Sequence, residues 1–154
     1  MGIFIVEAVF PSVLAVFAAR RLQPHPLLLF GVEINFDNYD LVPPSVRIVH
    51  PLTREPLRAS QVGYKFPRDL GNGNRQDILQ AFDDERPFLC LPGVREYHES
   101  SAHSGDAWLL HRGTTVGSLI YLLETIARYG TEPVQAMVPQ LGVNGFTLNA
   151  QPPL

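Results

Sequence analysis

The residues most able to do chemistry gather in one stretch of the sequence, between Cys90 and His111. This stretch contains the chain's one cysteine, its one tryptophan and three of its five histidines. Four of its side chains are of types that bind transition metals, namely Cys90, Glu96, His98 and His103. One thiolate, one carboxylate and two imidazoles favour zinc, which takes four such ligands in a tetrahedral arrangement. The sequence therefore predicts a zinc site built from these four residues.

The spacing of these residues adds support and also leaves an alternative. Glu96 and His98 are separated by one residue, so on an extended segment both side chains point the same way. Residues 104–106 are suited to form a turn behind His103 and to supply acceptors that orient the imidazoles. The alternative is that Cys90, which ends an apolar run, is a small buried core residue and that the histidines are solvated.

Length and composition place limits on the class of protein. The chain has 154 residues, which fits a single domain over 1–154. Twelve basic and fifteen acidic residues give a net charge of −3, which argues against nucleic acid as a partner. A lone cysteine cannot form an intramolecular disulfide, and this is typical of a reducing cytoplasm.

The N-terminal stretch 3–19 is apolar apart from Glu7 and Ser12. It resembles a membrane segment in hydropathy, but it is short for a span, contains Pro11 and lacks preceding basic residues. We expect it to be a buried or oligomerising element, so that no membrane is involved and a homo-oligomer is a possible state.

Local patterns predict short elements separated by turns. Alternating apolar residues predict strands, which then form an antiparallel sheet from about residues 27–36, 45–50 and 61–66. Helical spacing predicts helices at 12–22, 76–82 and 114–129, the last capped by Thr114 or Thr115 and ended by Gly130. Residues 3–10 are expected to be a strand or an irregular arm, and 141–148 a hairpin around Asn144-Gly145.

Several of these features occur in the order found in ubiquitin-conjugating (E2) enzymes. They are the run from Tyr39 to Pro51 with its Pro43-Pro44 pair, the Cys90-Leu91 pair, and Trp108 ahead of an amphipathic helix. Over roughly residues 10–130 the sequence resembles this E2-like fold. The Cys-Glu-His-His series also resembles the predicted metal-binding "CEHH" domain of bacteria.

These resemblances imply an α+β fold with a UBC-like antiparallel sheet flanked by helices and a metal-binding loop after the cysteine strand. They imply zinc as the cofactor and a ubiquitin-like protein, an E1-like activating enzyme or a JAB-type peptidase as partners. One departure matters for mechanism. The E2 pattern has an asparagine shortly before the cysteine that helps to stabilise the oxyanion, and here Asn72 and Asn74 lie in a separate loop.

Three functions are compatible with the sequence. The first is a zinc-binding accessory or adaptor protein of a bacterial ubiquitin-like conjugation pathway. The second is an E2-like transferase in which Cys90 forms a thioester and His98 or His103 acts as base. The third is a zinc hydrolase in which Glu96 or Glu99 activates a metal-bound water. A thiolate bound to zinc is a poor acyl acceptor, so the first two functions exclude each other at Cys90.

Overall fold

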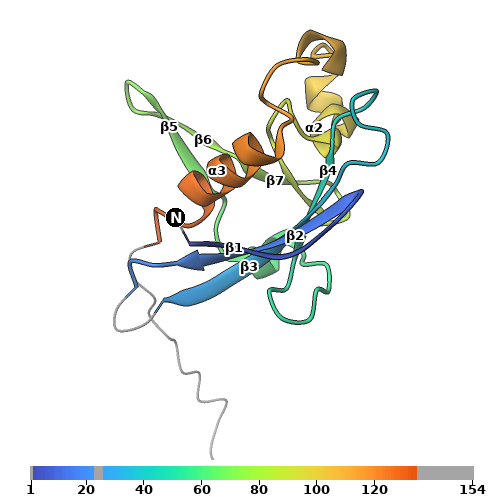
Figure 1. Cartoon of the computed structure of the whole chain (residues 1–154). Coiled ribbons are helices and arrows are strands. Elements are labelled where there is room, and N and C mark those ends of the chain that lie inside the picture. The colour runs from blue at the N-terminus through green and yellow to red at the C-terminus, as the bar shows by residue number, and fades with distance from the viewer. Residues whose placement is uncertain (1, 23–25, 135–154) are drawn as a thin grey trace, which may run out of the picture.

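The computed structural model describes residues 2–22 and 26–134, and it has a mixed α+β architecture in which the strand pairs are antiparallel (Figure 1). The predicted α+β class with an antiparallel sheet is therefore confirmed. In chain order the elements are β1 (Ile3–Val9), β2 (Ser12–Ala19), β3 (Leu27–Asn35), β4 (Ser45–Val49), α1 (Ala59–Val62), β5 (Pro67–Gly71), β6 (Asn74–Asp77), β7 (Leu79–Ala81), β8 (Pro87–Leu89), α2 (Arg95–Glu99), the 3-10 helices η1 (Ser101–His103) and η2 (Trp108–Leu110), and α3 (Leu119–Gly130).

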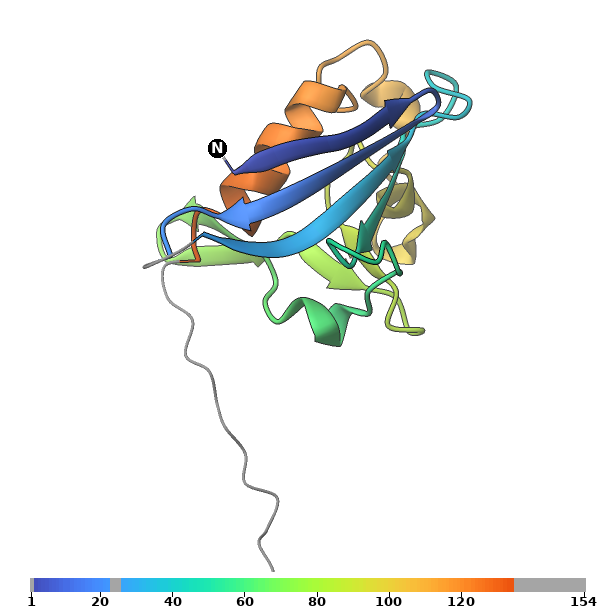
Figure 2. The ribbon, with the colours of Figure 1, turned by 60° about the horizontal axis from the view of Figure 1, so that its bottom comes forward.

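The first four strands form one antiparallel sheet in the order β1-β2-β3-β4, as Figure 2 shows. Strands β3 and β4 lie where alternation predicted them, and Ile34 pairs with Val46. One face of the sheet packs against α3, and the close contact is made by Gly130, where a Cβ atom would lie 2.9 Å from the ring of Phe30. The core consists of fully or almost fully buried apolar residues of the sheet, the 66–91 segment and α3, including Phe17, Phe30, Phe66, Leu89, Leu122 and Ile126.

The predicted helix at 12–22 is wrong, because this segment forms strand β2. It pairs with β1 on one side and with β3 on the other. Residues 14–19 are all buried, so apolar side chains point to both faces and the alternation that marks a half-buried strand is lost. The remaining apolar spacing fits a helix equally well, which explains the error.

The segment 61–82 also differs from its prediction. Residues 61–66 do not join the main sheet as a strand; α1 ends at Val62, and Phe66 accepts a backbone hydrogen bond from Ile78 at 3.1 Å. The predicted helix at 76–82 is wrong, since these residues belong to β6 and β7. Asn72 and Gly73 both have positive φ and connect β5 to β6 by a two-residue turn.

The C-terminal helix α3 is confirmed in type, but it begins later than predicted. Its N-cap is Ser118, whose hydroxyl accepts from the amide of Tyr121, rather than Thr114 or Thr115. Gly130 is its last helical residue rather than the residue after it. Among the helices at 2–22 and 26–134, none is long and apolar enough to cross a bilayer. The predicted hairpin at 141–148 lies outside the described residues, and the single domain over 1–154 stays a prediction.

Candidate functional site

Cys90 follows directly after β8, at the point where the backbone leaves the β7–β8 hairpin. Its amide donates to the carbonyl of Ile78 at 2.7 Å, which fixes the start of the loop that follows. The side chain is only 7 % exposed, and burial raises the pKa of the thiol above its ordinary value. Because the thiol is protonated at neutral pH, any reaction at this sulfur requires a base close to it.

His103 supplies such a group. It ends η1, in the loop after α2, and its Nε2 lies 3.4 Å from Sγ of Cys90. The imidazole stacks on the ring of Tyr97, with ring centroids 3.9 Å apart and an angle of 18° between the ring planes. This stacking holds the imidazole against the sulfur, so two of the four residues singled out from the sequence are adjacent in the structure.

Gln76 is a third group at the sulfur, and the sequence did not identify it. It lies in β6, and its side-chain amide Nε2 is 3.8 Å from Sγ of Cys90. An uncharged amide fourteen positions before the cysteine carries no chemical signature of its own. Only the route of the chain from β6 to Cys90 brings it there.

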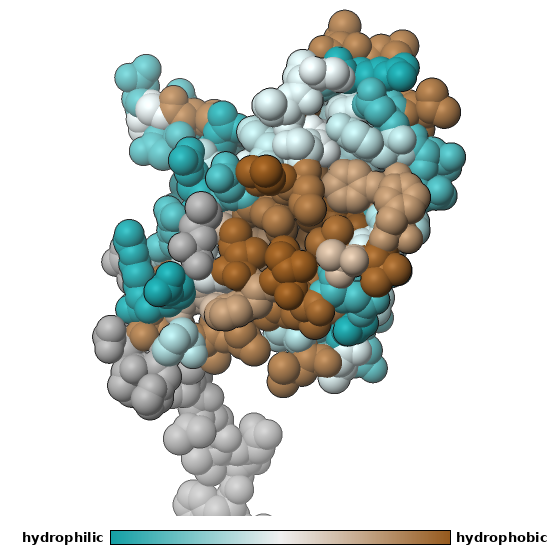
Figure 3. Space-filling model, viewed as in Figure 1, coloured by the Kyte–Doolittle hydropathy of each residue, from teal (hydrophilic) through white to brown (hydrophobic). Residues whose placement is uncertain are grey.

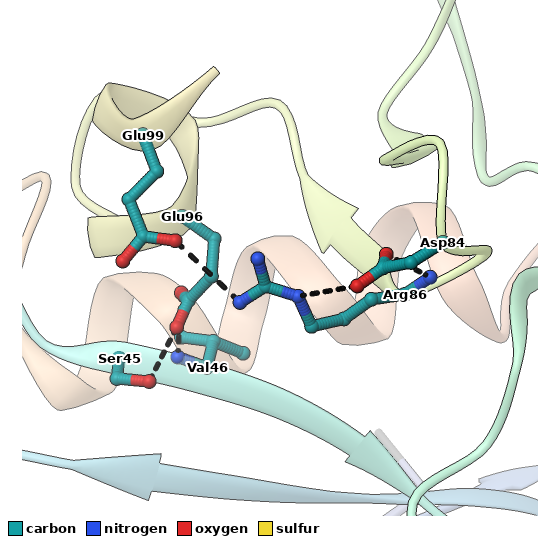
Figure 4. Close-up of polar contacts among 6 residues, drawn as sticks. All are labelled: Ser45, Val46, Asp84, Arg86, Glu96 and Glu99. Atoms are coloured by element: carbon teal, nitrogen blue, oxygen red, sulfur yellow. Dashed lines mark hydrogen bonds and ion pairs between the residues drawn. The ribbon is translucent and has the colours of Figure 1, made fainter.

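Glu96 lies elsewhere, and the expectation that it joins Cys90 in a metal site is not met by the geometry. Its carboxylate is buried and accepts hydrogen bonds from the hydroxyl of Ser45 and from the amide of Val46, the latter at 3.0 Å (Figure 4). It therefore ties α2 to the start of β4. Glu99, on the same helix, faces Arg86 at 3.5 Å instead.

His98 is also committed to other contacts. Its Nδ1 lies 2.7 Å from the carbonyl oxygen of Asp106, and its Nε2 lies 2.8 Å from that of Pro92. Both ring nitrogens therefore lie against carbonyl oxygens of the chain rather than against the Cys90 sulfur. His98 thus bridges the residues just after Cys90 to the loop that contains His103.

The helical conformation of α2 explains why Glu96 and His98 separate. In an extended segment two residues at this spacing share a face, but in a helix they point in nearly opposite directions, about 160° apart around the axis. The prediction assumed an extended segment. The structure instead directs Glu96 to β4 and His98 to the Asp106 loop.

Asp106 holds that loop in place. Its carboxylate accepts from the hydroxyl of Tyr97 at 2.7 Å and contacts Nε2 of His111 at 2.6 Å. The bond from Tyr97, followed by that from His111, lowers the pKa of Asp106. Burial, with the neighbouring Asp106 carboxylate as the next cause, raises the pKa of Tyr97 to about 12. Through Asp106, the loop that follows His103 is thereby held by Tyr97 of α2 and by His111.

The predicted zinc ligands do not fit zinc in this arrangement. Cys90 and His103 are together, while Glu96 and His98 have their donor atoms in other hydrogen bonds. Within residues 2–22 and 26–134, no group of three or more His, Cys, Asp or Glu side chains is placed to hold a metal ion. The arrangement that is present is a thiol with an imidazole and an amide beside it.

Comparison with known proteins identifies the family. Residues 1–71 and 68–134 match the Y4jH-like family. The chain belongs to this family. It is also 38 % identical, over 159 residues, to the uncharacterized protein y4jH of Sinorhizobium fredii, an alignment that covers 92 % of this chain and 77 % of that protein. Because neither name states an activity, the function of this Y4jH-like chain is inferred from its geometry.

Proposed function

We propose that this Y4jH-like protein is an E2-like acyl transferase in which Cys90 accepts the C-terminal acyl group of a ubiquitin-like protein. The observation that carries the proposal is the placement of His103 and Gln76 at 3.4 Å and 3.8 Å from the Cys90 sulfur. The order of the main elements supports it. An antiparallel four-stranded sheet, a Pro43-Pro44 pair before β4 and a cysteine after a hairpin agree with the E2-like resemblance of the sequence.

The chemistry is an exchange of thioesters. His103 Nε2 takes the proton from the Cys90 thiol, and the thiolate attacks the carbonyl carbon of the donor thioester. The tetrahedral intermediate collapses when the carbon–sulfur bond to the donor thiol breaks, and the departing thiolate receives the proton from His103. No oxidant is required. The donor would be the ubiquitin-like protein held as a thioester on an E1-like activating enzyme.

Gln76 takes the role of the asparagine that, in E2 enzymes, precedes the cysteine and helps to stabilise the oxyanion. An amide donor next to the attacked carbon stabilises the negative oxygen of the tetrahedral intermediate, and this kind of contact contributes strongly to acyl transfer. Gln76 is close enough to Cys90 to reach an oxygen bound to a carbon on its sulfur. The missing asparagine is therefore no argument against acyl transfer here.

The zinc-binding adaptor is the second candidate, and the adjacency of Cys90 and His103 is the observation in its favour. To complete a tetrahedral site, Glu96 would have to leave Ser45 and Val46, and His98 would have to release a carbonyl. The zinc hydrolase has less support. Its catalytic carboxylate would have to leave Ser45 and Val46 if it is Glu96, or Arg86 if it is Glu99. Acyl transfer needs none of these contacts to break, whereas both zinc functions do.

The test uses a short peptide thioester that ends in glycine, mixed with the purified chain and followed by intact mass spectrometry. We expect a thiol-sensitive adduct of one acyl group that is absent in Cys90→Ser. Replacing Gln76 by Ala should slow its formation about 100-fold, because an oxyanion donor is lost. Replacing Gln80 by Ala is the matched control, since Gln80 is a glutamine of β7 that contacts the carbonyl of Asp77 instead.

Elemental analysis of the same preparation separates the candidates. One zinc per chain, together with no adduct, would overturn the transferase and support the adaptor. An adduct that forms equally fast in Gln76→Ala and Gln80→Ala would remove the argument from geometry, even if Cys90 reacts.

A further inference from the structure

Within residues 2–22 and 26–134, strand β1 forms one edge of the main sheet and pairs with β2 on its other side. An edge strand presents unpaired backbone amides and carbonyls, and most proteins protect such an edge with lysine, proline or a covering element. β1 has the sequence Ile-Phe-Ile-Val-Glu-Ala-Val, which contains neither lysine nor proline. A bulge interrupts its pairing with β2 between Ile5 and Glu7.

Apart from Glu7, the side chains of β1 are apolar, and all of these but Ile3 are exposed. Phe4, Ile5 and Val6 are each just over half exposed, Val9 is 64 % exposed, and Phe10 directly after the strand is 87 % exposed. Hydrophobic residues gather on the face that contains β1 and α3, as the brown area in Figure 3 shows. Continuous apolar patches of this kind mark contact surfaces rather than ordinary surface.

The opposite edge of the same sheet is protected. Strand β4 packs against α2 and β8, and Val49 forms a bridge with Pro56 beyond the strand. Arg47 of β4 pairs with Glu33 of β3 on its outer face. Among residues 2–22 and 26–134, this fold covers the β4 edge with its own elements, whereas the side chains of the β1 edge stay exposed.

Charge on β1 indicates what kind of partner fits. Its one charged residue, Glu7, is already paired with Arg54 at 2.8 Å, so the strand offers no unpaired charge for a charged partner. The surface is instead complementary to another apolar strand. If a two-fold axis passes near Val6, each Phe4 faces Ala8 of the other copy, and the two Glu7 side chains do not face each other.

The exposed apolar side chains of this edge supply contact area for a dimer. Two aromatic and three aliphatic side chains, each more than half exposed, contribute toward the roughly 800 Å² per partner of a standard interface. A two-fold arrangement uses the same patch on both copies and closes after two chains.

We propose that two copies of this chain associate through β1, edge to edge, with Phe4, Val6 and Phe10 at the interface. The sheet then continues from one protomer into the other. This inference does not depend on the chemistry proposed for Cys90.

The test is the mass of the full chain in solution, measured by light scattering after gel filtration over a range of concentrations. We expect twice the 17.1 kDa of one chain. Val6→Lys places a charge at the middle of the edge and should weaken the dimer at least about 100-fold, because a lysine must be desolvated there. Leu110→Lys is the matched control, since Leu110 is 70 % exposed in η2 and should leave the dimer intact.

A second measurement remains decisive if Val6→Lys fails to fold. In a Cys90→Ser background, Val6→Cys should form an intermolecular disulfide on mild oxidation, and Leu110→Cys should not. A wild-type chain that stays at 17.1 kDa at all concentrations would overturn the proposal. So would equal cross-linking of the two cysteine variants.

Discussion

Glu96 and Cys90 are six positions apart, yet their surroundings differ in the way that separates a structural group from a reactive one. The carboxylate of Glu96 is buried and held by a hydroxyl and a backbone amide of β4. The Cys90 sulfur is also buried, but its polar neighbours, His103 and Gln76, stand at 3.4 Å and 3.8 Å. The carboxylate, with its hydrogen bonds made, fixes α2, whereas the Cys90 thiol lies beside a base and an amide donor and can form a bond to carbon once His103 takes its proton.

The largest effect on stability is expected from Glu96→Ala. This change leaves the amide of Val46 buried without an acceptor and removes the link between α2 and β4. We expect the free energy of unfolding to fall by about 3 kcal/mol, measured by urea denaturation. Glu99→Ala is the control, because its pair with Arg86 is exposed and should contribute less than about 1 kcal/mol. Equal losses in the two variants would mean that Glu96 is not the anchor described here.

A smaller effect is expected from His98→Gln. A glutamine amide cannot easily reach both carbonyls that His98 bridges, at Pro92 and Asp106. We expect a loss of about 1–2 kcal/mol from one unsatisfied carbonyl. The loop bearing His103 should also loosen, so iodoacetamide should modify Cys90 faster than in the wild type.

The rate of alkylation distinguishes a bridging role from simple instability. If Glu96→Ala and His98→Gln expose Cys90 in proportion to their losses of stability, the effect is global. If His98→Gln raises the rate more than its loss of stability predicts, His98 positions the Cys90 loop. A rate unchanged in His98→Gln would contradict that positioning role.

The sequence predicted the parts of the fold that have a long, clean period. Strands β3 and β4 alternate and lie close to their predicted ranges, whereas the amphipathic repeat of α3 predicts its type but not its start, which comes five residues later than at 114. The apolar spacing of β2 predicts a helix, since burial on both faces removes the alternation of a strand. The β6–β7 region also has a pattern that predicts a helix, because short strands leave too few residues to show a period of two.

The candidate site was predictable by residue type but not by arrangement. Cys90 and His103 were found because thiols and imidazoles are few and chemically distinctive. Glu96 and His98 were grouped with them because nothing in a polar stretch indicates a helix of only five residues. Gln76 was missed because its part depends on a hairpin that brings distant residues together. Local chemistry is visible in a sequence, whereas contacts set by topology are not.

The smallest effect, and the one most specific in its pH dependence, is expected from Tyr97→Phe. The variant removes the hydroxyl that donates to Asp106 at 2.7 Å and keeps the ring that stacks on His103. At neutral pH we expect a loss of about 1 kcal/mol, measured by urea denaturation. Tyr129→Phe, at a half-buried tyrosine of α3, is the control.

The pH dependence of this stability difference distinguishes an effect of the Tyr97 hydroxyl from an effect of its ring. The pKa of Asp106 is lowered in the folded protein, so its stabilisation is present above the ordinary value of 3.8 and is lost as the pH falls through the folded pKa. The pKa of Tyr97 is raised from 10.0 to about 12, so its contribution is complete below pH 10.0 and is lost as the pH rises toward 12. The difference between wild type and Tyr97→Phe should therefore be constant from about pH 5 to 9 and shrink at both ends. A difference that does not change with pH would show that the hydroxyl acts only through packing, and that Asp106 does not fix the His103 loop through Tyr97.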